Sequence, residues 1–222
     1  MIDIKDDETL DEIGGVRIIQ KKKGYRFSAD SLLLADFTDL TCATKALDLG
    51  TGSGVIAILL AKRSQELSVV GIELQETLFD LAVRNVELSS LSDRVTILKG
   101  DLKGIKERFE AGSFDLVVSN PPYYSIGKGR IGPNLERRVA RHEVAVTLAD
   151  IVKASEYLLR DGGRVAVVYP AGRYSELISE MRSHKIGPVR VKEVHTKVFE
   201  VVLVEGKKGY AGGLLLEPPF CL

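Results

Sequence analysis

Short runs of β-branched and aliphatic residues alternate along the chain with longer stretches in which apolar positions recur every three to four residues. This alternation predicts an α/β fold, in which a mostly parallel sheet carries helices on both faces. The predicted strands are Lys45–Leu49, Val69–Glu73, Arg94–Lys99, Asp115–Ser119 and Arg164–Tyr169. The predicted helices are Val55–Arg63, Gln75–Leu88, Leu148–Leu159 and Tyr174–Ser183, and we expect the Asp161-Gly162-Gly163 turn to separate the third helix from the strand that follows.

Two further β-branched runs, Val189–Val194 and Val198–Val204, lie close together near the C-terminus. Too few residues separate them for a helical crossover, so they should pair antiparallel as a hairpin at the sheet edge. The pattern therefore predicts seven strands, the last one reversed. Gly206–Gly213 is expected to be a loop and Leu214–Leu222 a short tail.

The first forty residues predict a small extension. Val16–Gln20 and Tyr25–Phe27 flank a basic turn, Lys21–Gly24, which indicates a β-hairpin. A short apolar helix, Ser31–Phe37, is expected to follow, with Asp30 as its N-cap. No internal repeat or long linker is visible. We therefore expect residues 1–40 to pack as an extension on a single core domain of residues 41–222.

Composition restricts the function classes. Of the 222 residues, 45% are hydrophobic and 28% charged, as in ordinary globular proteins. The longest uncharged apolar run, Val55–Ala61, is too short to span a bilayer, and the acidic start lacks the features of a secretory signal. We expect a cytoplasmic protein with no membrane partner. Two distant cysteines and three scattered histidines show no metal-ligand spacing, so no metal is expected.

A predicted strand runs directly into the glycine-rich segment Gly50-Thr51-Gly52-Ser53-Gly54 and then into a helix. Glycines allow close backbone approach to a ligand, although a plain tight turn has the same appearance. A dinucleotide fingerprint requires a third glycine where this chain has Val55. Asp48, two residues before the loop, would repel a pyrophosphate but suits a ligand with an ammonium and a sulfonium group. The loop therefore favours S-adenosylmethionine (SAM) as cofactor.

Acidic residues end the next two strands. Glu73 lies 19 residues after Gly54, close to the spacing at which a carboxylate binds ribose hydroxyls. Asp101 is placed to accept a hydrogen bond from an adenine amino group, with Leu102 covering the ring. The complete set expected to bind the cofactor from these loops and strand ends is Asp48, Gly50, Thr51, Gly52, Gly54, Glu73, Leu74, Asp101, Leu102 and Asn120.

The turn Asn120-Pro121-Pro122-Tyr123 after the fourth strand carries the most specific signal. Prolines stiffen a turn and retain their carbonyl acceptors. If the Asn120 side-chain oxygen and the Pro121 carbonyl accept the two N–H groups of a conjugated amine, its lone pair is directed at a methyl donor. Positioning then supplies most of the catalysis, and no strong base is needed. Tyr123 offers a flat face on which a planar base can stack.

These motifs resemble those of Rossmann-like class I methyltransferases that act on planar amino groups. Within that class the chain looks most like the bacterial tRNA1(Val) adenine-37-N6-methyltransferase family. The resemblance extends from Tyr25–Ala35 to Ala140–Glu143 and Leu203–Gly206. It implies an enzyme that methylates adenine N6 beside the anticodon, with Ser28 and Asp30 near the methionine end of the cofactor. The family often has proline and a longer loop after the histidine equivalent to His195, whereas Thr196-Lys197 leads almost directly into the last strand here.

Lysine plus arginine equals aspartate plus glutamate at 31 each, so a tRNA must meet local basic patches. The residues expected to bind RNA form two clusters, Lys21, Lys22, Lys23 and Arg26 before the core, and Lys128, Arg130, Arg137, Arg138, Arg141 and His142 after the Asn-Pro-Pro-Tyr turn. Protein-glutamine N5-methyltransferases and rRNA or DNA base methyltransferases use the same turn and remain alternatives. A non-catalytic RNA-binding module leaves the ordered acids unexplained, and the glycine spacing disfavours a dehydrogenase. The oligomeric state is not predicted.

Overall fold

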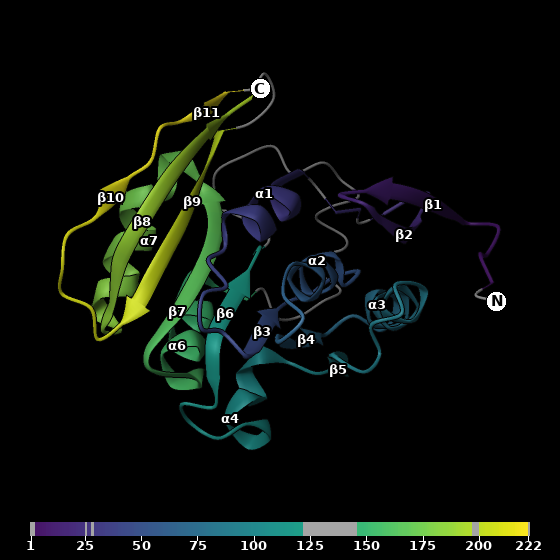
Figure 1. The fold of residues 1–222 in the computed structure, drawn as a ribbon, viewed down its shortest axis with the longest axis horizontal. Coiled ribbons are helices and arrows are strands. Elements are labelled where there is room, and N and C mark those ends of the chain that lie inside the picture. The colour runs from purple at the N-terminus through teal and green to yellow at the C-terminus, as the bar shows by residue number, and fades with distance from the viewer. Residues whose placement is uncertain (1–2, 25, 28, 122–145, 197–199, 222) are drawn as a thin grey trace.

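Parallel strands form the centre of the main sheet in a computed structural model, which describes residues 3–24, 26–27, 29–121, 146–196 and 200–221 (Figure 1). The parallel strands are β3 (Lys45–Leu49), β4 (Ser68–Glu73), β5 (Val95–Lys99), β6 (Phe114–Ser119) and β7 (Leu159–Pro170). In space they follow the order β5-β4-β3-β6-β7. The order reverses direction at β3, so the carboxyl ends of β3 and β6 flank the switch point at which ligands bind open α/β sheets.

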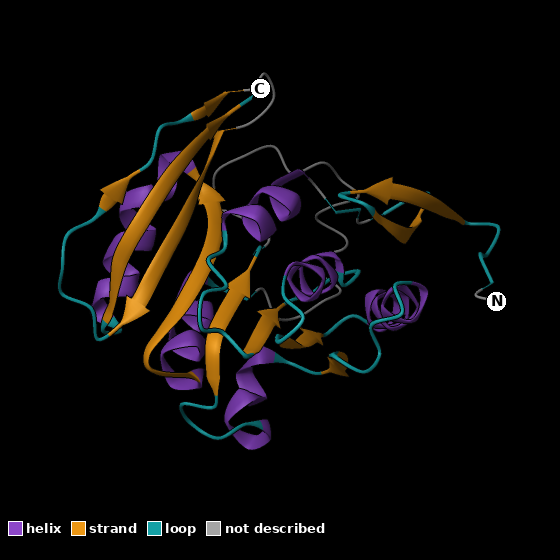
Figure 2. Cartoon of the chain, viewed as in Figure 1, coloured by secondary structure: helices purple, strands orange, loops and turns teal. Residues whose placement is uncertain are grey.

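Helices cover both faces of this sheet (Figure 2). One face carries α1 (Ala29–Phe37), α2 (Val55–Arg63) and α3 (Glu76–Leu88), and the other carries α4 (Ile105–Arg108), α6 (Leu148–Leu158) and α7 (Tyr174–Ser183). Two short 3₁₀ turns, η1 (Leu102–Gly104) and η2 (Ala171–Arg173), follow β5 and β7. Within the part of the chain that the structure describes, no helix is both long and apolar enough to cross a membrane.

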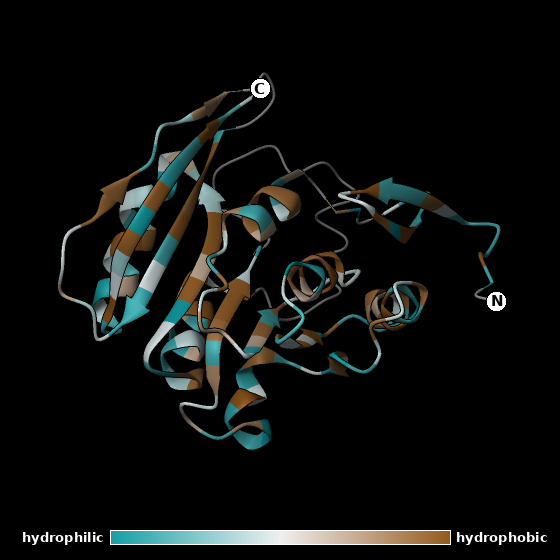
Figure 3. Cartoon of the chain, viewed as in Figure 1, coloured by the Kyte–Doolittle hydropathy of each residue, from teal (hydrophilic) through white to brown (hydrophobic). Residues whose placement is uncertain are grey.

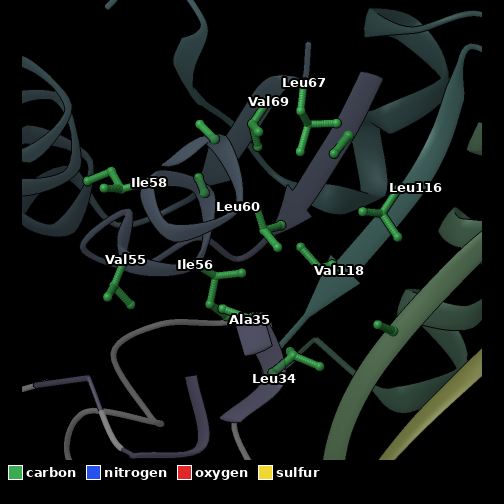
Figure 4. Packing of buried hydrophobic residues seen from close by; sticks show 14 of the residues in the cluster. Leu34, Ala35, Val55, Ile56, Ile58, Leu60, Leu67, Val69, Leu116 and Val118 are labelled. Atoms are coloured by element: carbon green, nitrogen blue, oxygen red, sulfur yellow. The ribbon is translucent and has the colours of Figure 1, made fainter. Parts of the chain in front are cut away.

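The alternation of strand residues divides the core into two layers. Leu47 and Leu49 pack against the layer of α6 and α7, whereas Ala46 belongs to the layer of α1 and α2. In the layer of α1 and α2, Leu116 and Val118 of β6 lie beside Leu34, Ile56 and Leu60, as Figure 4 shows. Hydrophobic positions are accordingly concentrated along the central strands (Figure 3). The period of two places the side chain of residue 120, just beyond β6, on the face covered by α1.

The predicted C-terminal hairpin is confirmed. β8 (Ile186–His195) and β9 (Glu200–Lys208) pair antiparallel, and β9 lies between β8 and β7, reversed relative to both. Residues 206–208 continue β9, so the expected loop begins later than predicted. The tail adds β10 (Leu215–Leu216) and β11 (Phe220–Cys221), which pair parallel with β8. These two short strands extend the seven predicted ones to a nine-stranded sheet.

The N-terminal hairpin was predicted in the wrong place. Its strands are β1 (Glu8–Ile13) and β2 (Val16–Lys21), paired in the register Ile13 with Val16. The turn is Gly14-Gly15, where both glycines have positive φ, as a two-residue hairpin requires. Arg26 and Phe27 belong to no strand, and Tyr25 lies outside the described residues. The acidic sequence of β1 conceals its alternation, so the basic segment after Gln20 resembles a hairpin turn more than Gly14-Gly15 does.

Buried polar groups connect this hairpin to α3. The side chain of Asn85 is fully buried; its Oδ1 accepts from the Ile19 N–H at 2.7 Å and its Nδ2 donates to the Ile19 carbonyl at 3.1 Å. Nδ2 also donates to the Ser53 carbonyl in the glycine loop at 2.9 Å. The buried Glu8 carboxylate accepts from both terminal nitrogens of Arg84 at 2.8 Å. The hairpin is thereby bonded to the helix that packs behind the loop.

Other element boundaries agree closely with the predictions, with two exceptions. α1 begins at Ala29, so Asp30 lies in its first turn rather than at its N-cap. β7 begins directly after α6, and the predicted turn Asp161–Gly163 falls inside it, where its register with β6 shifts and Gly162 has a φ of 73°. Leu159 pairs with Phe114, so β7 begins before the predicted turn and continues after it.

Arginines from three elements bond to the C-terminal end of α1. Arg63 of α2 donates to the Ala35 and Thr38 carbonyls, and Arg190 of β8 donates to the Phe37 carbonyl at 2.5 Å. Arg164 of β7 pairs with Asp39 and donates to the Thr41 carbonyl. Carbonyls at a helix end lack partners within the helix, and cations there interact favourably with the helix dipole. α1 is therefore fixed to the sheet and to α2.

Candidate active site

Glycines with positive φ shape the loop between β3 and α2. Gly50, Gly52 and Gly54 have φ values of 73°, 59° and 83°, which residues with a Cβ rarely adopt. Gly54 is the N-cap of α2, and an added Cβ there would lie 3.3 Å from that of Ala82 on α3. An added Cβ at Gly50 would meet nothing within 4 Å. The loop is thus tightly packed against α3 at Gly54 and open at Gly50.

Backbone N–H groups of this loop are used inside the protein. The Thr51 N–H donates to the Ile72 carbonyl, the Gly52 N–H to Glu73 Oε2, and the Gly54 N–H to the Thr51 carbonyl, each at 2.9 Å. A phosphate-binding loop directs such groups at its ligand. These three donors are already engaged, so the geometry disfavours a pyrophosphate here.

Close packing also fixes the distance between the loop and β4. An added Cβ at Gly71 would lie 2.9 Å from both Thr51 side-chain atoms Oγ1 and Cγ2, and 2.9 Å from Ile97. Real Cβ atoms are not found that close to other heavy atoms, so only glycine allows this approach. The absence of a side chain at Gly71 therefore lets the loop rest on the end of the strand that carries Glu73.

Asp48 supports the loop from below. Its side chain is fully buried, and its Oδ2 accepts from the Thr51 hydroxyl at 2.6 Å. Burial raises the pKa of Asp48 to about 7, and the nearby Glu73 charge acts in the same direction, although the Thr51 hydrogen bond opposes both. Asp48 has no exposed surface, and the Thr51 hydroxyl is its side-chain contact with the loop.

Glu73 lies at the end of β4 and is 6% exposed. Its Oε2 accepts from Gly52 and its Oε1 from the Gln75 N–H at 2.8 Å. Burial raises the pKa of Glu73. A carboxylate can accept about four hydrogen bonds, so these two leave capacity for ligand hydroxyls. Leu74, which follows, is 42% exposed and adds an apolar surface.

At the end of β5, both Asp101 and Leu102, which are predicted to contact the cofactor, have contacts within the protein. Asp101 caps η1, where its Oδ1 accepts from the Lys103 N–H at 2.9 Å, so one of its carboxylate oxygens has a structural partner. Leu102 is only 8% exposed and packs in the core with Ile105. Leu74 therefore presents much more apolar surface to a ligand than Leu102 does.

Asn120 follows β6 and faces α1, as the strand period requires. Its Nδ2 donates to the hydroxyl of Ser31 at 3.0 Å. The preceding Ser119 donates through its hydroxyl to the Leu49 carbonyl at 3.0 Å, which joins the ends of β6 and β3. Pro121 is buried, whereas Pro122 and Tyr123 lie outside the described residues. The turn thus begins next to the glycine loop, held from two sides.

Ser31 is a contact of Asn120 that sequence reasoning missed. It is 2% exposed and lies on the face of α1 that also buries Leu34 and Ala35. A polar residue on the apolar stripe of a short helix was the available signal. Asp30, beside it, is 6% exposed, and Ser28 lies outside the described residues.

The first basic cluster is partly neutralised by the hairpin itself. Lys21 pairs with Asp7 at 2.9 Å and with Glu8 at 3.1 Å, and Arg26 pairs with Asp11 at 2.6 Å. Lys22 and Lys23 are exposed. The second cluster, Lys128, Arg130, Arg137, Arg138, Arg141 and His142, lies outside the described residues. Among the residues that are described, no group of three or more His, Cys, Asp or Glu side chains is placed to hold a metal ion.

The relatives reported from sequence comparison share one name. A tRNA1(Val) (adenine(37)-N6)-methyltransferase of Tolumonas auensis is 29% identical over 73% of this chain and 66% of that protein. A protein of the same name from Porphyromonas gingivalis is 34% identical over 68% of this chain and 59% of its own length. One from Glaesserella parasuis is 33% identical over 78% of this chain and 71% of its own length. The match with the first two thus spans about three fifths to two thirds of their length.

Solved structures share the fold. A predicted O-methyltransferase from Agrobacterium tumefaciens superimposes with a TM-score of 0.67 at 21% identity, covering 86% of each chain. A geranyl diphosphate methyltransferase in complex with SAM gives a TM-score of 0.59 at 16% identity, over 81% of this chain and 78% of that one. The fold is that of class I methyltransferases, as predicted. The model of one family, described as the methyltransferase small domain, matches residues 25–201. The chain belongs to the methyltransferase small domain family.

Proposed function

We propose that the protein transfers a methyl group from SAM to the N6 amine of an adenine in RNA, and that its substrate is a tRNA modified near the anticodon. The observation that carries this proposal is the Asn120 amide, held by Ser31 at the end of β6, one strand away from a glycine loop supported by two buried carboxylates. The names of the sequence relatives support the choice of adenine in tRNA.

The residues around the loop fit SAM better than a dinucleotide. Asp48 and Glu73 place acidic groups at the loop, which favours a cationic ligand over a pyrophosphate. Glu73 has acceptor capacity left for ribose hydroxyls, Leu74 offers an apolar surface for adenine, and the front of Gly50 is open. When bound, SAM would supply a methyl carbon on a sulfonium, which an amine attacks in line as the carbon–sulfur bond breaks.

Asn120 and Pro121 would then hold the amine. An exocyclic amine conjugated to a ring is a poor nucleophile because its lone pair is delocalised. Acceptance of its two N–H groups by Asn120 Oδ1 and the Pro121 carbonyl directs the lone pair out of the ring plane. Tyr123 would stack on the base, an interaction worth about 1–3 kcal/mol. After transfer the surplus proton leaves to solvent, so the site needs no strong base.

The substrate base must leave its stack to reach this turn. Unstacking costs a few kcal/mol and is least costly where a base is not paired, which favours a single-stranded loop such as that of an anticodon. Lys22 and Lys23 on the hairpin, together with the second basic cluster, would contact phosphates. We infer that these residues position the RNA and that the Asn120 turn selects the amine.

Incubation with labelled SAM separates the candidate substrates. The protein is mixed with total bacterial tRNA that lacks adenine-37 methylation, with rRNA, with duplex DNA, or with a glutamine-containing peptide. Nucleosides and peptides are then identified by mass spectrometry. The expected product is N6-methyladenosine in tRNA. Label in N5-methylglutamine, or in rRNA or DNA alone, would replace the proposal by the corresponding alternative, and binding of a nicotinamide dinucleotide in place of SAM would overturn it.

A further inference from the structure

The amide of Asn120 has a donor end and an acceptor end, and only the acceptor end can bind an amine N–H. We propose that Ser31 is a positioning residue that holds Nδ2 and thereby turns Oδ1 toward the substrate amine. This inference rests on the proposed function, because it concerns the orientation of the group that would hold the amine.

The contact itself is specific. Ser31 Oγ and Asn120 Nδ2 are 3.0 Å apart although 89 residues separate them in sequence. Ser31 is 2% exposed, so water cannot readily take its place. Because the carboxamide is planar, fixing Nδ2 against α1 also fixes the direction of Oδ1. A rotation of the amide would break the hydrogen bond from Nδ2 to Ser31, at the cost of one hydrogen bond.

The support of Ser31 is rigid. Leu34 and Ala35, on the same face of α1, pack against Ile56 of α2 and Val118 of β6, as Figure 4 shows. The other end of α1 is bonded by Arg63 and Arg190, as described above. The Ser31 hydroxyl is therefore set by the packing of the whole helix rather than by a mobile loop, which is what a positioning residue needs.

Variants of Ser31 test the inference through the chemical step. Single-turnover methylation, with enzyme in excess over tRNA, should be about tenfold slower in Ser31→Ala and in Ser31→Cys. The Kd for SAM should stay within twofold of the wild-type value. Ser31→Thr, which retains the hydroxyl, should recover most of the rate. Ser155→Ala is the matched control, because Ser155 is equally buried on a helix and its hydroxyl bonds only within α6.

Coupling to Asn120 separates positioning from general damage. In an Asn120→Ala background, Ser31→Ala should change the residual rate by less than twofold, since no amide remains to be oriented. Full additivity of the two losses would overturn the proposal. So would wild-type activity in a folded Ser31→Ala variant.

A readout without cofactor or RNA keeps the two proposals distinguishable. In the ligand-free protein, the side-chain amide protons of Asn120, assigned by NMR from their absence in Asn120→Asp, should exchange with solvent at least tenfold faster in Ser31→Ala than in Ser155→Ala. Unchanged exchange would refute the Ser31 contact even if methylation occurs. Fast exchange in Ser31→Ala, combined with a wild-type protein that methylates nothing, would refute the proposed function and leave the contact established.

Discussion

The buried side chain of Asp48 should make the stability of the protein depend on pH. Its carboxyl is fully buried, and burial raises its pKa from 3.8 to about 7. Between those values the unfolded chain releases the proton while the folded chain retains it. The free energy of unfolding therefore decreases as the pH rises through this window, and the penalty is constant above it.

Asp48→Asn should remove this pH dependence. Relative to wild type, we expect the variant to gain stability steadily from pH 4 to pH 7 and to keep the gain at pH 8, by at most about 4 kcal/mol. Urea denaturation at pH 4.5, 6 and 8 measures the difference. Asp115→Asn is the control. Burial alone would raise the pKa of Asp115, but hydrogen bonds from Thr44, Lys45 and Arg160 lower it to about 2. Asp115→Asn should thus lose a nearly constant amount of stability at the three pH values. A constant difference in stability between Asp48→Asn and wild type would contradict the expectation.

Asn120→Ala should separate chemistry from cofactor binding. Loss of the amide oxygen removes one of the two acceptors proposed for the amine, so the methyl transfer rate should fall by about 100-fold or more. The Kd for SAM, measured by calorimetry, should remain near that of wild type. Full activity in this variant would exclude Asn120 from the mechanism. A much higher Kd for SAM would assign Asn120 to cofactor binding instead.

Sequence predicts the positions of residues well where they stand at the ends of predicted strands. The glycine loop, Glu73 and Asn120 all stand at strand ends, so a correct strand pattern brings them to one edge. Ser31 was missed because its role depends on a contact across 89 residues. Leu102, predicted to cover the adenine ring, is 8% exposed and belongs to the 3₁₀ turn that Asp101 caps. The roles of these residues toward SAM and RNA stay predictions.

At the scale of elements, a buried carboxylate is one of the groups that connect the N-terminal hairpin to α3. The hydrogen bond from Arg84 outweighs burial and, with Lys21, lowers the pKa of Glu8 from 4.5 to about 2. Glu8 thus stabilises the folded chain above about pH 4.5, and this contribution disappears as the pH falls toward 2. We propose that residues 1–40 are an extension of the catalytic domain, whose docking this ion pair controls.

Glu8→Gln should loosen the hairpin at neutral pH. The variant leaves Arg84 without its charge partner, at a cost of about 3 kcal/mol. Hydrogen exchange of the Ile18 and Ile19 amides, followed by mass spectrometry or NMR, should be faster than in wild type at pH 7, and the difference should shrink toward pH 2. Glu12→Gln, an exposed acid on the same strand, is the control and should change little. Equal protection in both variants would show that the pair does not hold the hairpin.

The sequence predicted the core elements well because their apolar periods are strong. It failed at the hairpin because β1 carries four acidic or polar residues in six, and its stabilising partners, Asn85 and Arg84, lie on a helix more than sixty residues away. It also could not show the two short strands of the tail. Their pairing with β8 depends on backbone bonds along an edge, not on an alternating pattern.

At the scale of the whole molecule, the equal numbers of acids and bases mean that RNA binding depends on which cations remain unpaired. Lys21 and Arg26 are neutralised by hairpin acids, whereas Lys22 and Lys23 are exposed. Local ion pairs therefore decide how much of the first basic cluster a phosphate can use.

The affinity for tRNA should fall steeply with ionic strength. Lys23→Gln should lower the slope of log K against log salt concentration by about 1, whereas Lys21→Gln should change it less, because Asp7 and Glu8 already balance that charge. Fluorescence anisotropy from 50 to 250 mM salt gives both slopes. Tight binding with no salt dependence would refute the phosphate contacts.

The position of β9 has a consequence for how the chain is made. β7 and β8 are both synthesised before β9, yet each needs β9 as its neighbour, so the growing polypeptide holds two open strand edges apart until residues 200–208 emerge. Such edges invite pairing with other chains, and insertion between them requires long-range contacts that form slowly. Premature termination between β8 and β9 should therefore yield a fragment that aggregates.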